Sequence, residues 1–321
     1  MTRFRSLLPV AVTAVAASVF AIGAPAHGDP VVDKVVVIGL DGLMYSRALD
    51  ASAPNLTGLA AQGLLSRSSI KGHITVSGPS WSTVLTGVWD TKHGVKNNDF
   101  TAAPFDKYPS VFTQIEKADS TRKTASVATW NKIATIAGSG TPHADVNTVT
   151  PAVPGDTDES KTDANTASGA VVAIADGDDF VFTHLDQVDG AGHKSGSASP
   201  AYLDAITRVD AQVGKIVAAV DARAASHTTE RWTILVTSDH GHTPTGGHGG
   251  QSTAETENFV IARGPGFTPG ATRTDYTIVD ITPTVADIIG VPASSGFDGV
   301  SMRSGGPGNP STGSAQLPTG S

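Results

Sequence analysis

The sequence predicts a single α/β domain with a mainly parallel central sheet and helices on both of its faces. Apolar, β-branched runs at 34–42, 178–189 and 231–242 each lead into Asp, Gly or His residues, as strands buried on both faces do. Between the last two runs, segment 199–225 has apolar residues at helical spacing. Strand, helix and strand therefore follow one another, which is typical of a parallel sheet connected by helices.

The remaining elements fit the same scheme in chain order. The expected helices are 54–63, 110–118 and 278–291, and the expected strands are 123–130 and 257–264. Gly290 is expected to stop the last helix, because glycine readily adopts the backbone conformation that ends a helix. No internal repeat or sharp boundary interrupts the pattern, so we expect one domain over residues 27–302.

Both ends of the chain differ from this domain. Residues 1–26 combine two early arginines with an apolar stretch and the small-residue site Ala24-Pro25-Ala26, which predicts a signal peptide cleaved after Ala26. A membrane anchor is the alternative, but the apolar stretch is shorter than the roughly 20 residues that a span needs. We therefore expect a secreted or periplasmic protein without a stable membrane anchor. Residues 303–321 are rich in Gly, Pro and Ser and are expected to be disordered.

Composition narrows the classes of function. The chain has 30 acidic and 22 basic residues, a formal net charge of -8, and no basic block that could follow a phosphate backbone. Nucleic-acid binding is therefore not expected as its main role. The absence of cysteine from the sequence excludes disulfides, thiolate metal ligands and a lipidated cysteine.

Three aspartates, Asp41, Asp189 and Asp239, follow the apolar strands. The carboxyl ends of parallel strands meet at one edge of a sheet, where ligands of such folds bind, so we expect these side chains to point toward one site. A single strand-end aspartate can also merely cap the next turn or helix. The histidines that accompany these aspartates favour a functional interpretation.

His193 follows Asp189 across a Gly-Ala-Gly segment, which we expect to form a loop. His240 comes directly after Asp239, and a glycine-rich loop then brings back His248. Carboxylate oxygens and imidazole nitrogens are the usual ligands of Zn²⁺ when thiolates are absent. Together with Asp41 these residues exceed the ligand number of one tetrahedral ion. The sequence therefore predicts two divalent ions, most readily Zn²⁺.

The segment TVSGPSWSTVLTG, residues 75–87, supplies the candidate nucleophile. Ser77 stands at a Ser-Gly-Pro corner before a helix-compatible run, where free backbone N–H groups would favour an anion. The same corner could be an ordinary turn. A two-metal site about 4 Å across suits phosphoryl transfer, and contact with a metal would ionise the Ser77 hydroxyl without a histidine base.

In these motifs the chain resembles the alkaline phosphatase superfamily, and most closely its branch of type I phosphodiesterases and nucleotide pyrophosphatases. The matching segments lie between Lys34 and about Gly250 in the family's order, and VDITPTVADIIGVP extends the likeness to Pro292. They are VVVIGLDG, TVSGPSWSTVLTGVWDTKHGV, DQVDGAGH, TSDHGH and GGHGG. One such segment is a weak signal, but the ordered set is highly specific. The resemblance implies an alkaline phosphatase-like fold.

The resemblance also implies two sets of metal ligands. One set is Asp41, Ser77, Asp239 and His240, and the other is Asp189, His193 and His248. Ser77 matches the family's nucleophile, which is followed by one residue and then a proline, here Pro79. Ser80 is the competing candidate and stands where better-known phosphodiesterases have an asparagine that holds a phosphate oxygen.

Four further residues need a role. His242, two residues after His240, is the alternative to His248 as a ligand. His93 is expected to be structural, and Asn98 just beyond it is a candidate to line the substrate pocket, although asparagines in loops often form turns. Lys194 is the cation best placed in sequence to reach the substrate.

The function implied by the resemblance is a secreted hydrolase that cleaves a phosphodiester or nucleotide pyrophosphate bond through a phospho-Ser77 intermediate. A phosphomonoesterase of the same superfamily is the close alternative. No Arg or Lys lies between Gly72 and Trp89, which favours diesters, because a monoester brings a second negative charge to the site. A sulfatase is disfavoured because Trp81 stands where those enzymes carry an arginine, and a non-catalytic binding protein would have lost ligands.

Overall fold

An eight-stranded sheet runs through the centre of the protein. The computed structural model describes Met1 and residues 30–100, 103, 105–292 and 296–303. The strands are β1 (Val32–Leu40), β2 (Leu64–Ser69), β3 (Thr124–Ala128), β4 (Val146–Val149), β5 (Phe180–Leu185), β6 (Glu230–Thr237), β7 (Glu257–Arg263) and β8 (Ala271–Arg273). Their order across the sheet is β4-β3-β5-β1-β6-β7-β2-β8.

The sheet is mainly parallel, as the sequence predicts. The neighbours from β4 to β6 all pair in parallel, whereas β7 is antiparallel to both β6 and β2. The central strand β1 lies between β5 and β6, which follow it much later in the chain. Such a reversal of strand order leaves a crevice at the carboxyl ends of the strands, where ligands of open α/β sheets bind.

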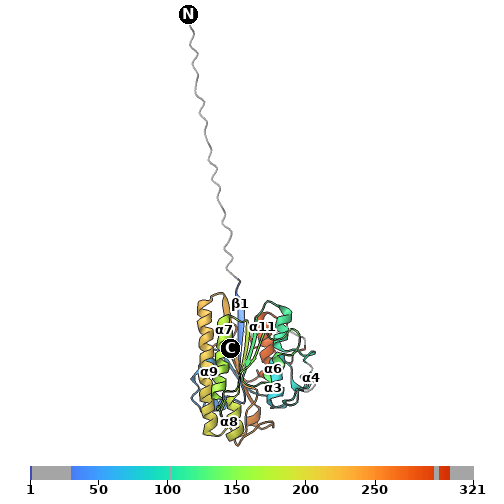
Figure 1. Cartoon of the computed structure of the whole chain (residues 1–321), viewed down its shortest axis with the longest axis vertical. Helices are drawn as coiled ribbons and strands as arrows, with labels where there is room; N and C mark the ends of the chain where they lie inside the picture. Colours follow the sequence, from blue (N-terminus) through green and yellow to red (C-terminus); the bar gives the residue numbers. More distant parts are fainter. Residues whose placement is uncertain (2–29, 101–102, 104, 293–295, 304–321) are drawn as a thin grey trace, which may run out of the picture. The chain divides into compact units, whose positions relative to one another are not determined.

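Helices cover both faces of the sheet, and Figure 1 shows α7 and α9 on one side of β1 with α3, α6 and α11 on the other. The helices are α1 (Tyr45–Ala48), α2 (Pro54–Gln62), α3 (Ser77–Thr86), α4 (Asp90–His93), α5 (Val111–Ala118), α6 (Ile133–Ala137), α7 (Ser160–Asp176), α8 (Gln187–Ser195), α9 (Pro200–Ser226), α10 (Thr253–Thr256) and α11 (Ile281–Ile289), with a 3₁₀ turn at Ile278–Asp280. The described residues from Val31 to Arg303 belong to one compact unit.

The continuous apolar run in β1 is explained by these two layers. Val36 and Ile38 pack into the core under α7 and α9, whereas Val35 and Val37 pack into the core under α3 and α11. Successive side chains of a strand point to opposite faces, so a strand covered on both faces needs apolar residues at every position. The expected single α/β domain is thus confirmed.

Two details differ from the sequence-based expectation. The segment after β5 is helix α8 rather than a loop, although two of its residues between Asp189 and His193 are glycines. Helix α7 was not expected, because its buried side chains are mostly small and give little periodic contrast; Ala167 and Ala170 face the core beside Ile174. Helices α2, α5, α9 and α11 and strands β3 and β7 lie where they were predicted.

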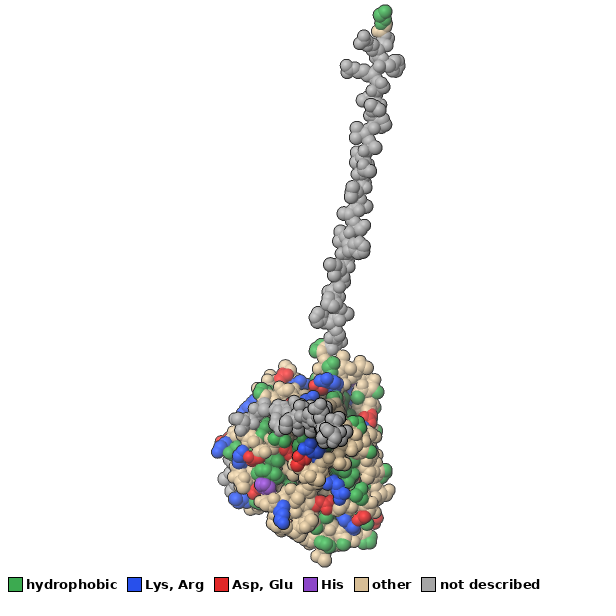
Figure 2. Space-filling view, turned by 180° about the vertical axis from the view of Figure 1, so that it is seen from behind, with side chains coloured by type: hydrophobic (Ala, Val, Ile, Leu, Met, Phe, Trp, Pro, Cys, Tyr) green, Lys and Arg blue, Asp and Glu red, His purple; other side chains and the backbone are tan. Residues whose placement is uncertain are grey.

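The expected signal peptide and the tail beyond Arg303 lie outside the described residues. Within the described part of the chain, no helix is both long and apolar enough to cross a membrane. On the face drawn in Figure 2, Lys and Arg side chains are interspersed with Asp and Glu side chains over the described surface.

Candidate active site

The carboxyl ends of β1, β5 and β6 bring a group of acidic residues to one edge of the sheet. Asp41 follows β1 directly, Asp186 follows β5, and Asp239 lies two residues beyond β6. Asp41 is 1 % exposed and Asp239 is fully buried. Helix α8 adds Asp189 one turn further along. The convergence expected from strand topology is therefore observed.

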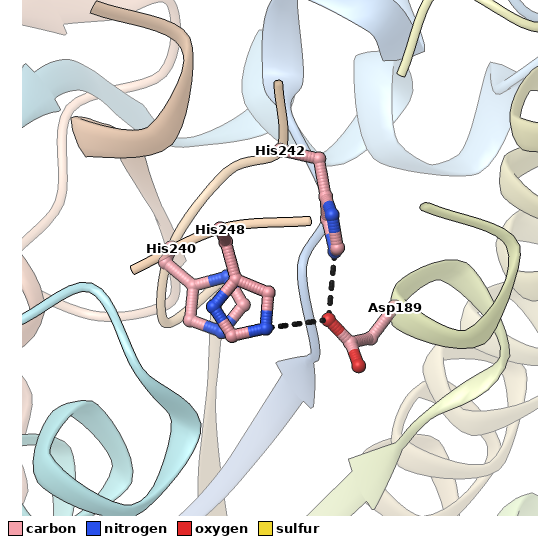
Figure 3. A group of neighbouring side chains, drawn as sticks. All are labelled: Asp189, His240, His242 and His248. Atoms are coloured by element: carbon pink, nitrogen blue, oxygen red, sulfur yellow. Dashed lines mark hydrogen bonds and ion pairs between the residues drawn. The ribbon is translucent and has the colours of Figure 1, made fainter. Parts of the chain in front are cut away.

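Three histidines of the loop after β6 surround Asp189, as Figure 3 shows. The Nε2–H of His242 donates to Asp189 Oδ1 at 2.7 Å, and His248 Nε2 lies 3.7 Å from the same oxygen. The rings of His240 and His248 stack with their centroids 3.8 Å apart. On the other side, His240 Nε2 lies 3.1 Å from Asp239 Oδ2 and 3.7 Å from Asp41 Oδ1.

Ser77 reaches this cluster from the first position of helix α3. Its Oγ lies 3.3 Å from His240 Nε2, and the residue is 6 % exposed. The free N–H groups of a helix N-terminus attract an anion, as expected for a phosphate beside this hydroxyl. The backbone N–H of Gly78 donates to Asn98 Oδ1 at 2.8 Å, which places the Asn98 side chain next to Ser77.

Two residues that the sequence analysis did not select hold Asp41 in place. The indole Nε1–H of Trp81 donates to Asp41 Oδ2 at 2.8 Å, and His184 Nε2 lies 2.9 Å from the same oxygen. Both side chains are fully buried. Trp81 lies one helical turn after Ser77, and His184 is a single polar ring in an apolar strand. Both positions are noticeable in the sequence, but the sequence does not show that Asp41 is their partner.

In two histidines, a backbone carbonyl beside Nδ1 leaves Nε2 as the ring nitrogen that could bind a metal. His248 Nδ1–H donates to the Thr75 carbonyl at 2.8 Å, so its Nε2 carries a lone pair and no hydrogen and faces His193 Nε2 at 3.1 Å. His240 Nδ1 faces the Gly241 carbonyl at 3.3 Å in the same way. A backbone carbonyl on one ring nitrogen commonly orients the other for a metal.

The cluster places buried carboxylates close to one another, an arrangement that bound cations would stabilise. Burial and the neighbouring Asp41 carboxylate raise the pKa of Asp239 well above its usual value. Asp41 Oδ1 and Asp239 Oδ2 are buried and have no hydrogen-bond partner among the described residues. Burial and the charge of His248 lower the pKa of His240 to about 3, so this ring is neutral and able to act as a ligand.

Among the described residues, donor atoms within 4.8 Å of one another form three groups. Two adjoining ones, here called the metal-binding groups, are Asp189, His240, His242 and His248, and Asp41, Asp239 and His240. In the third, Asp41, His184 and Asp186, His184 Nε2 already lies 2.9 Å from Asp41 Oδ2.

The second group contains the two aspartates and the histidine of one set implied by the resemblance, and the fourth member, Ser77, lies beside it. The first differs from the expected set in including His240 and His242 and in lacking His193. His193 Nε2 lies nearby, 3.2 Å from Asp189 Oδ2 and 3.1 Å from His248 Nε2.

The spacing of Asp189 and His193 works through a helix. In α8 the two residues are four apart and share one face, so the helix itself brings the two side chains together. The glycines of this segment serve another purpose. A Cβ on Gly192 would lie 2.6 Å from the His242 ring, so glycine is needed for His242 to approach Asp189.

Two candidate substrate residues lie away from the cluster. The hydroxyl of Ser80 is buried and donates to the Ile74 carbonyl at 2.9 Å. Lys194 Nζ donates to the Thr157 carbonyl at 2.5 Å, on the outer side of α8. Neither contact brings the side chain to Ser77. His93 is buried between Thr83 Oγ1 at 3.0 Å and the Val95 N–H at 3.1 Å, as a structural residue would be.

Gly192→Ala is expected to weaken metal binding by roughly 10–100-fold, the size seen when residues that orient metal ligands are changed. The new methyl group would displace His242 from Asp189, while alanine itself favours the helix. Gly190→Ala, on the same helix, is the control, because its Cβ would meet only Glu159 Oε2 at 3.4 Å. Titration against a chelator measures the affinity, and equal affinities in the two variants would contradict the role given to Gly192.

Comparison with known proteins agrees with this geometry. The family model of type I phosphodiesterase/nucleotide pyrophosphatase matches residues 35–280. The chain belongs to this family. The match includes Ser77 and each aspartate and histidine of the two metal-binding groups.

Individual relatives are more distant. Human ectonucleotide pyrophosphatase/phosphodiesterase family member 7 is 26% identical over 234 residues, covering 69% of this chain and 50% of that protein. The chain thus matches about half the length of this curated relative. Mouse ectonucleotide pyrophosphatase/phosphodiesterase 5 has a similar structure, with a TM-score of 0.61 and 15% identity over 81% of this chain and 96% of that one.

A phosphonate monoester hydrolase from Silicibacter pomeroyi is also structurally similar, with a TM-score of 0.64 and 16% identity over 87% of this chain and 78% of that one. Structural likeness at such low identity shows a shared fold. Membership of the family therefore rests on the family model, since a shared fold alone does not identify a reaction.

Proposed function

We propose that the protein is a hydrolase that cleaves phosphodiester or nucleotide pyrophosphate bonds through a phosphoserine intermediate on Ser77. The observation that carries this proposal is the position of Ser77 Oγ, 3.3 Å from His240 Nε2 at the junction of the two metal-binding groups. A hydroxyl at a helix N-terminus beside acidic and histidine ligands suits attack on a phosphate. The small-molecule substrate is supported by the mouse relative described in complex with AMP.

The residues of the site have two kinds of role, to hold the metal ions and to act on the phosphate. When bound, two divalent ions, with Zn²⁺ the best match to these ligands, would lower the pKa of the Ser77 hydroxyl and offset the charge of the phosphate. We assign Asp41, Asp239 and His240 with Ser77 to one ion, and Asp189, His193 and His248 to the other. Trp81 and His184 orient Asp41 by hydrogen bonds.

Ser77 Oγ would attack phosphorus while the bond to the leaving alcohol or phosphate breaks, and water would then hydrolyse the phosphoserine. Asn98 is a candidate to hold a free phosphate oxygen. Its Oδ1 accepts from Gly78 N–H, which turns the Nδ2 donor group to the other side of the amide. Donors placed where charge develops are among the strongest contributors to such catalysis.

Phosphomonoester hydrolysis is the alternative. It is disfavoured because the lysines near the site are not directed toward Ser77. Lys92 Nζ pairs with Asp298 Oδ1 at 2.5 Å, and Lys194 Nζ is held by the Thr157 carbonyl. Lys96 is exposed. The sites of monoesterases usually offer a cation to the additional charged oxygen, and none of these three lysines has a contact that directs it to Ser77.

We expect kcat/KM for 4-nitrophenyl phenyl phosphate to exceed that for 4-nitrophenyl phosphate, two substrates with the same leaving group. The diester brings one negative charge and the monoester two, and none of the three described lysines near the site is directed to Ser77 to offset the second charge. Release of 4-nitrophenol by the mature chain, with metal content measured on the same sample, gives both values. A faster monoester would contradict the diesterase proposal, and reversal of that order in Lys194→Ala would identify Lys194 as the cause.

We also propose that residues 1–26 direct secretion and that residues 27–302 form the catalytic domain. The basic start, the apolar stretch and the small residues before Ala26 support the first proposal. The compact unit that begins at Val31 supports the second. N-terminal sequencing of the exported protein checks the expected cleavage after Ala26.

A further inference from the structure

Helix α8 carries two of the three residues assigned to the second ion, and its sequence is a poor helix former. The helix is nine residues long and has Gly190 and Gly192 in its interior. Short helices are marginal in water, and glycine disfavours a helix interior. The positions of Asp189 and His193 therefore depend on contacts that hold α8 from outside.

The N-terminus of α8 is capped by a residue of another helix. Asp163 lies in the first turn of α7. Its Oδ1 accepts a hydrogen bond from the Asp186 backbone N–H at 3.0 Å, and its Oδ2 accepts one from the Gln187 backbone N–H at 2.9 Å. The side chain of Asp186, the residue before α8, makes no capping hydrogen bond to the described residues. Asp163 thus supplies a cap that the local sequence does not.

The Asp163 carboxylate is well fixed for this role. The residue is 1 % exposed, and the Thr129 hydroxyl donates to Oδ1 at 2.6 Å. A negative charge is favourable at a helix N-terminus, where backbone N–H groups lack partners within the helix. Hydrogen bonds to an ionised acceptor are also stronger than those between neutral groups. Loss of the carboxylate would leave buried N–H groups of α8 poorly paired, which is costly.

We propose that Asp163 is a positioning residue for the second ion, the one assigned to Asp189, His193 and His248. It belongs to neither metal-binding group and acts on the ligands through α8. Asp189 lies in the first turn of α8, next to the capped N–H groups, and His193 follows four residues later. A shift of α8 would move both away from His248, which the Thr75 carbonyl holds separately. The inference rests on the proposed two-metal function.

The ligands of the other ion come from different elements. Asp41 follows β1, whereas Asp239 and His240 follow β6. Trp81 and His184 hold Asp41 by hydrogen bonds that do not involve α8. Loss of the α8 cap is therefore expected to weaken the binding of one ion and to spare the other.

Asp210 offers a matched control. This residue of α9 is also 1 % exposed and caps the N-terminus of α2 in the same way. Its Oδ2 accepts from the Asn55 backbone N–H at 3.1 Å, and its Oδ1 accepts from the Leu56 backbone N–H at 2.8 Å. Helix α2 contributes no residue to either metal-binding group. Asp163→Asn and Asp210→Asn thus weaken the same kind of cap, but only the first cap holds a helix with metal ligands.

Titration of the folded, full-length mature protein with Zn²⁺ against a chelator measures the affinity of each ion. We expect Asp163→Asn to weaken one ion by roughly 10–100-fold, the size typical of residues that orient metal ligands, and to leave the other nearly unchanged. Asp210→Asn should leave both affinities unchanged, although both variants should unfold at lower urea concentration. In a His248→Ala background, which lacks the second ion, adding Asp163→Asn should not weaken the ion that remains.

Unchanged Zn²⁺ affinities in Asp163→Asn would overturn the inference. Equal weakening of both ions in Asp163→Asn and Asp210→Asn would also overturn it, because that result indicates a general loss of stability. If Asp163→Asn does not fold, Thr129→Val removes one donor to the carboxylate and should weaken the same ion to a smaller extent. Unchanged affinities in that variant would then count against the inference.

Failure of the proposed function is distinguishable from failure of the cap. A wild-type protein that binds no divalent ion would overturn the two-metal function and, with it, the role of Asp163 toward an ion. Hydrogen exchange still measures the cap in that case. Amides of α8 should exchange faster in Asp163→Asn and amides of α2 faster in Asp210→Asn, whereas unchanged exchange in α8 would show that Asp163 does not hold this helix.

Discussion

Ser77→Ala is expected to lower turnover by several powers of ten while leaving about two metal ions bound. Loss of a nucleophile that acts together with its neighbours typically has an effect of this size. Asp41, Asp239 and His240 remain to hold the ion that Ser77 would contact, and the other ligand set does not include Ser77. Steady-state kinetics and metal analysis of the same sample measure both effects.

Ser80→Ala is the matched control three residues along the same helix. Its hydroxyl is buried and donates a hydrogen bond to the Ile74 carbonyl, so the substitution should change activity little. Near-normal activity in Ser77→Ala together with loss in Ser80→Ala would move the assignment to Ser80. A phosphorylated peptide containing Ser77, trapped at low pH, would identify the intermediate directly.

His248→Ala is expected to reduce bound metal from about two ions toward one, the number following from the two-metal scheme. The Thr75 carbonyl fixes the His248 ring through Nδ1, so its Nε2 lone pair is available as a ligand. His242 Nε2–H instead donates to Asp189 Oδ1 at 2.7 Å, which suits a residue that positions the carboxylate. His242→Ala should therefore weaken binding but retain two ions at saturation.

Metal titration followed by removal of unbound ions gives the stoichiometry of each variant. Loss of one ion in His242→Ala and full occupancy in His248→Ala would reverse the two roles. Activity loss alone does not separate them, because both residues contact the same aspartate.

The acidic site and its place in the fold were predictable because they depend on strand order and chain direction. Asp41 and Asp239 stand where buried strands end, and parallel strands end at one edge. The role of Trp81 was not predictable in this way. Its partner Asp41 is 40 residues away, and only the packing of α3 against β1 brings the two together.

The glycines between Asp189 and His193 led to a wrong prediction because their role depends on packing. Glycine usually disfavours a helix interior, which predicted a loop between Asp189 and His193. In the fold, contact with His242 requires the small residue at Gly192, and packing of α8 on α9 outweighs the local preference. The position of Ser80 likewise depends on the Ile74 carbonyl, which no spacing in the sequence reveals.

Helix α3 carries both Ser77 and Trp81, one turn apart, and Trp81 leaves no room for a Cβ on Gly39 of β1, where that atom would lie 2.6 Å from the indole. Ser77 and the donor to Asp41 thus belong to one rigid helix. A substitution that shifts α3 would misplace Ser77 and loosen Asp41 together, so single changes along this helix should be tolerated poorly. In a directed-evolution experiment that starts from a variant with a shifted α3, we expect the substitutions that restore activity to lie in residues packed against α3. Gly39 and Trp81 should stay unchanged.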